Sequence, residues 1–175
     1  MTSLLLRPPL SQLVGEVRAV VERNLPPQPT ADKVASCMRT VLGDPHLLEA
    51  DQRAGSSDGY CQHLLHVEPD GSFSVVALVW RPGQATPIHD HVCWCSVGVH
   101  QGEETEQRYR VENVGGERRL IPTKRMVNPL GTVCGIAPPG DIHQVSNTGS
   151  GTAISLHIYG ADISRLGNSI RRTYD

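Results

Sequence analysis

The spacing of apolar residues along the chain changes once, close to residue 60. Before that point, the apolar residues of SQLVGEVRAVVERN recur at intervals of three and four, which predicts an amphipathic helix that ends at the prolines of LPPQP. A second helix is expected over ADKVASCMRTVL, with Thr30 as its N-cap. Neither helix carries an obvious reactive group apart from Cys37. We therefore interpret residues 1–45 as a helical cap that covers an apolar sheet face.

From Tyr60 onward, short segments of strand character follow one another. The segments CQHLLHVE and FSVVALVW flank the turn PDGS and predict a hairpin. Further short strands are expected in CWCSVGV, EQRYRVEN, RRLIPTK, GTVCGIA and TAISLHIYG. Glycine, proline and aspartate turns separate them, which indicates an antiparallel sandwich or barrel over residues 60–160. The 175 residues fit a single domain, 1–175, and the basic tail SRLGNSIRRTYD has no assignment from its pattern.

The composition narrows the range of partners. The net charge is -2 and aromatic residues make up 4% of the chain, so we do not expect a nucleic-acid surface. No apolar stretch approaches the roughly 20 residues that span a bilayer, and the start MTSLLLRPPL has too short an apolar core for a signal peptide. We expect a soluble cytoplasmic protein with no membrane partner and with five reduced cysteines. The sequence leaves the oligomeric state open.

Two separated segments contain histidines in positions that suit a metal site. In PIHDHVCWCS, His89 and His91 are two residues apart, so on a strand both side chains point to the same face. The later segment PPGDIHQVSN contributes His143. Three neutral imidazoles would leave other metal positions open, as a catalytic metal requires. We predict that His89, His91 and His143 bind a metal ion.

A second set of polar residues lies on one expected strand, ISLHIY. Ser155, His157 and Tyr159 are spaced by two, so their side chains share one face of the strand. One interpretation is a half-polar strand with three unrelated side chains. The other is a hydrogen-bonded relay, in which Ser155 orients His157 and His157 orients the Tyr159 hydroxyl toward the metal.

The patterns G-x5-H-x-H and P-x-G-x2-H-x3-N around these histidines resemble the two motifs of the cupin superfamily. Together with SLHIYG, they make the chain similar to the cysteine dioxygenase family, the thiol dioxygenases of that superfamily, from about Tyr60 to Tyr159. The resemblance implies a cupin-type antiparallel β-barrel (jelly roll) with N-terminal helices packed on it. It also implies Fe(II) held by the three histidines, and oxidation of a small thiol to its sulfinic acid with both atoms of O2. Tyr159 would donate a hydrogen bond to the bound oxygen or thiolate.

The sequence departs from these relatives at Cys95. Most metal-binding cupins carry a glutamate four residues after the second histidine of the first motif, where this chain has Cys95. In the animal-type enzymes, the cysteine at the corresponding place is joined covalently to the relay tyrosine. A thioether between Cys95 and Tyr159 is therefore one hypothesis, and a small buried thiol is the other. Cys93 is expected to be plain lining of the same face.

The resemblance also bears on the substrate. The animal-type enzymes bind the substrate carboxylate with an arginine where this chain has Gln62, and the glutamine is similar to the bacterial branch that prefers 3-mercaptopropionate. In that branch an arginine near the C-terminus binds the carboxylate, which makes Arg165, Arg171 and Arg172 candidates, each with the alternative of being a surface arginine. The predicted substrates are 3-mercaptopropionate or L-cysteine, together with O2. A non-enzymatic cupin that binds or senses a small ligand remains the alternative.

Overall fold

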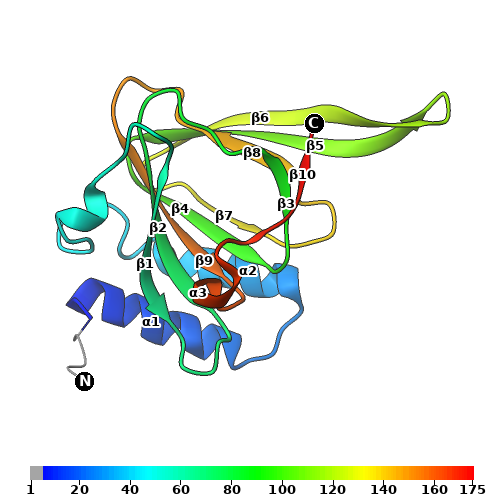
Figure 1. Cartoon of the computed structure of the whole chain (residues 1–175). Helices are drawn as coiled ribbons and strands as arrows, with labels where there is room; N and C mark the ends of the chain where they lie inside the picture. Colours follow the sequence, from blue (N-terminus) through cyan, green and yellow to red (C-terminus); the bar gives the residue numbers. More distant parts are fainter. Residues whose placement is uncertain (1–5) are drawn as a thin grey trace.

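The computed structural model describes residues 6–175 and has a mainly β fold with two helices near its N-terminus (Figure 1). The helical elements are α1 (Pro8–Val21), α2 (Pro27–Met38), the 3-10 helix η1 (Asp51–Arg53) and α3 (Ile163–Leu166). The strands are β1 (Cys61–Val67), β2 (Ser74–Trp80), β3 (Ile88–His91), β4 (Cys95–Gln101), β5 (Glu103–Val114), β6 (Glu117–Pro129), β7 (Val133–Ile136), β8 (His143–Ser146), β9 (Ala153–Tyr159) and β10 (Ile170–Tyr174). Residues 1–5, which belong to the expected cap and to the start of the chain discussed above, lie outside the described residues.

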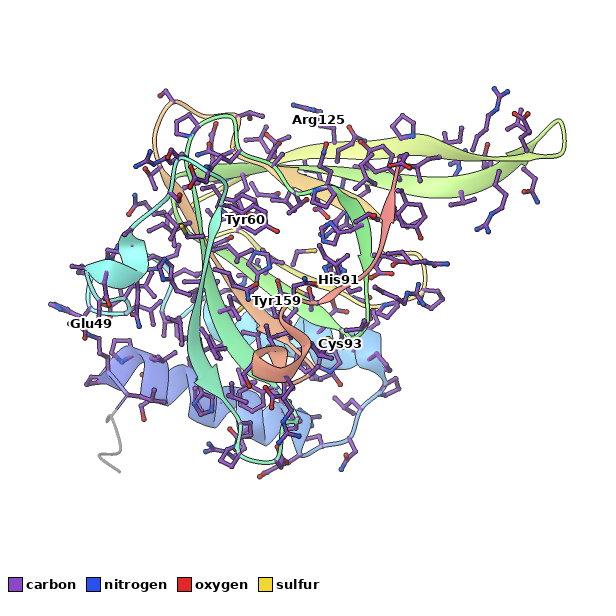
Figure 2. All side chains as sticks on the ribbon, in the orientation of Figure 1. Glu49, Tyr60, His91, Cys93, Arg125 and Tyr159 are labelled. Atoms are coloured by element: carbon purple, nitrogen blue, oxygen red, sulfur yellow. The ribbon has the colours of Figure 1, made fainter. Side chains whose placement is uncertain are left out.

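The strands form two antiparallel five-stranded sheets, in the orders β1-β2-β9-β4-β7 and β10-β3-β8-β5-β6. The two sheets face each other, and Tyr60, His91 and Tyr159 lie between them (Figure 2). The prediction of a mainly β, cupin-type fold with N-terminal helices is confirmed. The strands make two separate sheets, however, and not one closed barrel.

Strands β2 and β9 are buried along their whole length because both of their faces are covered. On the outer face, Leu156 and Ile158 pack in one apolar cluster with the buried sides of α1 and α2. On the inner face, Val76, Leu78 and Tyr159 belong to a second cluster between the sheets. This alternation directs the odd-numbered polar residues of β9 inward, toward the other sheet.

Helix α2 begins earlier than its sequence pattern suggests. It starts at Pro27, so Thr30 lies inside the first turn and its hydroxyl donates to the carbonyl of Pro26 (3.0 Å). The prediction of Thr30 as N-cap is wrong. A proline at the first helical position has the backbone angle that a helix needs and lacks only an N–H that would be unpaired there, so the helix can begin at Pro27 instead of Ala31, four residues sooner.

The C-terminal tail, which had no assignment from sequence, forms α3 and β10. Asp162 caps α3 by accepting a hydrogen bond from the backbone N–H of Ser164 (3.0 Å). Strand β10 then pairs antiparallel with β3, where Thr173 lies opposite His89. The tail therefore lies directly beside the strand that carries two of the three histidines. No helix within residues 6–175 has the length and apolar character needed to cross a membrane.

Candidate metal centre

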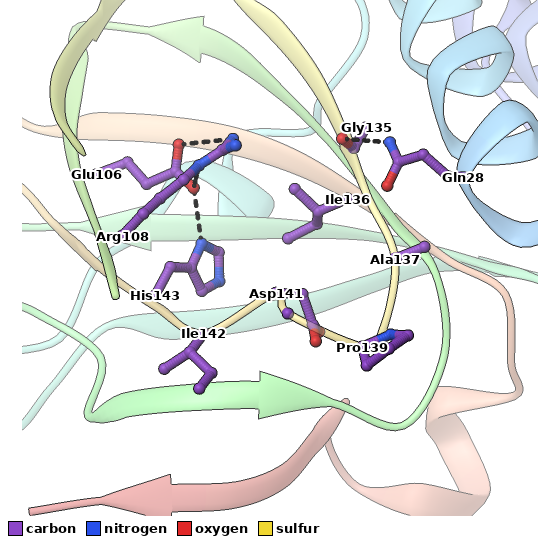
Figure 3. A pocket seen from close by; sticks show the side chains of 11 residues that line it. Gln28, Glu106, Arg108, Gly135, Ile136, Ala137, Pro139, Asp141, Ile142 and His143 are labelled. Carbon is purple, nitrogen blue, oxygen red and sulfur yellow. Dashed lines mark hydrogen bonds and ion pairs between the residues drawn. The ribbon is translucent and has the colours of Figure 1, made fainter. Parts of the chain in front are cut away.

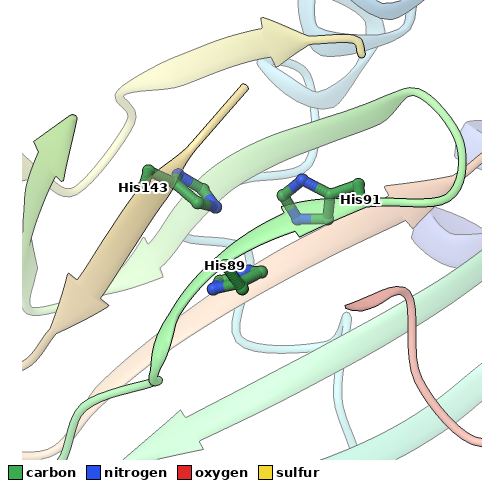
Figure 4. A group of neighbouring side chains, drawn as sticks. All are labelled: His89, His91 and His143. Atoms are coloured by element: carbon green, nitrogen blue, oxygen red, sulfur yellow. The ribbon is translucent and has the colours of Figure 1, made fainter. Parts of the chain in front are cut away.

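The three histidines of the two motifs meet at one point between the sheets (Figure 4). His89 and His91 extend from the same face of β3, and His143 begins β8 directly opposite His89 in the register. Their candidate ligand atoms all lie within 4.8 Å of one another, and all three side chains are buried. Among the described residues, these three form the only such group of histidine, cysteine or acidic side chains. This arrangement suits a metal ion.

Each imidazole is oriented through its Nδ1 atom. The acceptors are the carbonyl of Pro87 for His89 (2.9 Å), Asp141 Oδ2 for His91 (3.0 Å) and Glu106 Oε1 for His143 (2.9 Å). Since a carbonyl or carboxylate oxygen can only accept, Nδ1 carries the proton in each ring and the Nε2 lone pair is left for a metal. Burial, reinforced by His143 and His91, lowers the pKa of His89 to about 3. Burial also lowers the pKa of His143, so both rings are neutral ligands at physiological pH.

The carboxylates of Asp141 and Glu106 were not identified from the sequence. Burial alone would raise the pKa of Glu106, but hydrogen bonds from His143 and Arg108 outweigh it and the pKa is lowered. Figure 3 shows Glu106 between these two partners, with Arg108 Nε at 3.0 Å. Asp141 also accepts a hydrogen bond from the backbone N–H of His91 (2.9 Å). A signal was available for Asp141, which precedes His143 by two residues within PPGDIHQVSN.

The polar side chains of β9 form a continuous hydrogen-bonded chain next to the histidines. Ser155 Oγ lies 3.0 Å from His157 Nε2, and His157 Nδ1 lies 3.1 Å from the Tyr159 hydroxyl. The indole N–H of Trp80 donates to Ser155 Oγ (3.1 Å). The rings of Tyr159 and His91 have centroids 6.4 Å apart, which places the tyrosine at the edge of the three-histidine group.

Burial determines the protonation states of His157 and Tyr159 in this hydrogen-bonded chain. It lowers the pKa of His157 to about 3, with further contributions from the three histidines of the metal group. Burial also raises the pKa of the Tyr159 hydroxyl well above 10. A neutral imidazole therefore contacts a phenol that keeps its proton. Tyr159 can donate one hydrogen bond, either to His157 or into the space near the histidines.

A buried acid, Glu104 on β5, adjoins the Ser155 end of the chain. Burial raises the pKa of Glu104 to about 7, with a smaller contribution from Glu106, while the Ser155 hydroxyl and the Trp80 indole act in the opposite direction. Its Oε1 atom has no hydrogen-bond partner among residues 6–175. Nothing in the sequence GEETEQ distinguishes Glu104 from an exposed acid.

Cys95 is buried and lies opposite Tyr159 in the register of β4 and β9. Its Sγ atom is 3.9 Å from His157 Nδ1, and burial raises the pKa of the thiol well above 9. Cys93 lies in the turn between β3 and β4, half-buried against the inner cluster, and burial raises its pKa to about 11. Both are protonated thiols near neutral pH, and neither belongs to the three-histidine group.

The structure brings one of the expected substrate residues to the histidines. Gln62 on β1 lines the same cavity as the metal group and Tyr159. Arg165 does not, because its side chain is 86% exposed and pairs with Asp162. Arg171 and Arg172 do not either, because both form ion pairs with Asp90 on the opposite side of β3 (2.6 and 2.7 Å).

Two facing antiparallel sheets around a buried three-histidine group define a cupin-type protein with a possible metal site. The chain belongs to the cysteine dioxygenase type I family, whose family model matches residues 8–168.

Solved structures with a similar fold include an uncharacterized conserved protein with a double-stranded beta-helix domain from Klebsiella pneumoniae. It is 16% identical with a TM-score of 0.48, and the match covers 68% of this chain and 92% of that one. A cupin superfamily protein from Desulfitobacterium hafniense is 15% identical with a TM-score of 0.46, and the match covers 69% of this chain and 90% of that one.

Proposed function

We propose that the protein is a thiol dioxygenase that uses non-haem Fe(II) and O2 to oxidise a small thiol to its sulfinic acid. The reaction, R–SH + O2 giving R–SO2H, places both oxygen atoms on sulfur. The observation that carries the proposal is the position of Tyr159, oriented by its own hydrogen-bonded chain, at the edge of three histidines whose Nδ1 atoms are engaged, which leaves their Nε2 lone pairs for a metal. Membership of the cysteine dioxygenase type I family supports it.

The donor set suits ferrous iron. Imidazole nitrogen is a common ligand of iron, and three protein ligands leave room for other molecules on the metal. Bound there, iron would supply the redox chemistry and hold the substrate sulfur as thiolate. His89, His91 and His143 would hold it, and their neutral rings would not cancel its positive charge.

The relay residues act on the substrate side of the proposed reaction. Because Tyr159 keeps its proton, its hydroxyl can donate a hydrogen bond where negative charge builds up on oxygen or sulfur. His157 and Ser155 fix the direction of that hydroxyl. Leu78 and Val145 add apolar surface to the same cavity, which limits water near the reacting atoms.

The test is turnover of thiols by protein reconstituted with Fe(II) under anaerobic conditions. After O2 is added, an oxygen electrode and mass spectrometry should find one sulfinate formed for each O2 consumed, beginning with 3-mercaptopropionate and L-cysteine as the thiols implied by the resemblance. Protein loaded with Zn(II) is the matched control, because it has the same fold but no redox-active metal. Oxygen uptake no faster than that of free iron with thiol, across the whole panel, would refute the proposal and favour a ligand-binding cupin.

A further inference from the structure

Apart from the histidines, the side chains that line the cavity around the metal group are all neutral. Its other walls are formed by β1, β2, β8, β9 and the segment before β10, and no arginine, lysine, aspartate or glutamate lines it within residues 6–175. Tyr60, stacked on Trp80 with ring centroids 4.6 Å apart, closes one side, and burial raises the pKa of its hydroxyl. A substrate whose far end lies in this cavity would therefore meet only uncharged groups there.

The side-chain amides of Gln62 and Asn168 lie at the mouth of this cavity, and each already makes one hydrogen bond within the protein. Gln62 Nε2 donates to the carbonyl of Gly167 (3.0 Å), which leaves Oε1 as an acceptor. Asn168 Oδ1 accepts from the backbone N–H of Ile170 (2.9 Å), which leaves Nδ2 as a donor. Because each amide nitrogen carries two N–H groups, the mouth presents Gln62 Oε1 as an acceptor and N–H groups of both amides as donors, and neither amide is charged.

The nearby arginines are held elsewhere. Arg171 and Arg172 both donate to Asp90, which also accepts from the Tyr174 hydroxyl (2.8 Å). The Asp90 side chain is 1% exposed and lies on β3 between His89 and His91, on the face that points away from the cavity. Turning either arginine toward a substrate would weaken the pairing of a buried carboxylate, which is costly.

We propose that the substrate is a small thiol whose far end is a neutral polar group, a hydroxyl or a primary amide, bound by Gln62 Oε1 and Asn168 Nδ2. A primary amide matches the pair because it has both a donor and an acceptor. A carboxylate in the same place would lose its hydration, would meet no cation, and would leave Gln62 Oε1 without a donor. An ammonium group would leave Asn168 without an acceptor. The assignment depends on the proposed thiol oxidation at the adjacent metal.

The test compares two substrates of nearly equal size that differ in charge, 3-mercaptopropionamide and 3-mercaptopropionate, on Fe(II)-loaded protein. Anaerobic titration gives Kd for each thiol, and oxygen uptake with sulfinate detection gives kcat/KM. We expect both Kd and kcat/KM to favour the amide by at least about tenfold. Equal or better values for the acid would overturn the substrate class and leave the thiol dioxygenase intact. If neither thiol nor any other in the panel consumes O2, the proposed function itself is wrong.

A pair of arginine substitutions locates the effect. Asn168→Arg places a cation at the mouth and should reverse the preference toward the acid. Leu166→Arg is the matched control, because Leu166 is exposed on the same segment and does not line the cavity, so the preference for the amide should remain. If both variants shift the preference equally, or Asn168→Arg leaves it unchanged, Asn168 does not contact the far end of the substrate and the assignment fails.

Discussion

Replacing Glu104 with glutamine should make the protein more stable at pH 8 and change its stability much less at pH 5. Glu104 is 2% exposed, and one oxygen of its carboxyl group has no hydrogen-bond partner among the described residues. Burial raises its pKa to about 7, compared with the ordinary value of 4.5. The folded protein therefore favours the protonated acid, and above pH 7 it has to hold a buried charge. Glutamine has nearly the same shape and is never charged.

The direction and size of the effect follow from proton binding. Between pH 4.5 and 7 the folded chain holds a proton on Glu104 that the unfolded chain has released, so the free energy of unfolding falls as the pH rises and levels off above 7. A difference of one pKa unit between the folded and unfolded states corresponds to about 1.4 kcal/mol. The shift from 4.5 to about 7 therefore lowers the free energy of unfolding by roughly 3 kcal/mol once Glu104 is fully ionised. Between pH 5 and pH 8, the wild type should lose roughly 2–3 kcal/mol that Glu104→Gln keeps, or roughly 5–10 °C in Tm.

The assay is denaturant unfolding of metal-free wild type and variant at pH 5, 6, 7 and 8, followed by circular dichroism. Glu103→Gln is the control, because it makes the same chemical change one residue earlier at an exposed position, and its curve should run parallel to the wild type. Parallel curves for Glu104→Gln and wild type would refute the reasoning. So would a variant that is less stable at pH 8, since glutamine would then be replacing a carboxylate with good partners.

Four further predictions concern the metal group and its neighbours. His89→Ala should lose bound iron, measured by elemental analysis after desalting, with an unchanged circular dichroism spectrum; full occupancy would show that His89 is not a ligand. Asp141→Asn should bind metal roughly 10–100-fold more weakly, because His91 loses the carboxylate that orients it. Tyr159→Phe should keep its iron and lose roughly 100-fold in kcat/KM, and an unchanged rate would contradict its proposed role. The Cys95 hypothesis is tested by peptide mass spectrometry after aerobic turnover with iron. A Cys95–Tyr159 peptide lighter by two hydrogens, which O2 accepts, would support the thioether, and an unchanged mass would rule it out.

The features that sequence predicts well here are those that depend on local spacing. The apolar run FSVVALVW and the alternation in AISLHIY predict two strands, and the alternation also gives the direction of Ser155, His157 and Tyr159. The H-x-H spacing places His89 and His91 on one face for the same reason. These patterns hold because a strand repeats every two residues whatever its neighbours are.

The features that sequence misses depend on contacts between distant segments. Glu106 and Asp141 are 37 and 50 residues from the histidines they orient, and only the strand pairing brings them together. Strand β10, with the sequence IRRTY, has no apolar alternation, and its ion pairs with Asp90 help hold it against β3. Glu104 faces inward because of the register of β5, which no property of the acid itself reveals.

The chain has no carboxylate at position 95, but two carboxylates, those of Asp141 and Glu106, form hydrogen bonds with the histidines of the metal group. Cys95 is a protonated thiol that takes no part in the three-histidine group, while Asp141 and Glu106 each accept a hydrogen bond from the Nδ1–H of an imidazole. Such carboxylates make the imidazole a better donor without occupying a position on the metal. Three protein ligands would leave other positions on a bound metal open to small molecules such as the proposed thiol and O2. A glutamate ligand would fill one of those positions and cancel part of the charge that attracts the thiolate, so the outward placement of the acids suits the proposed reaction.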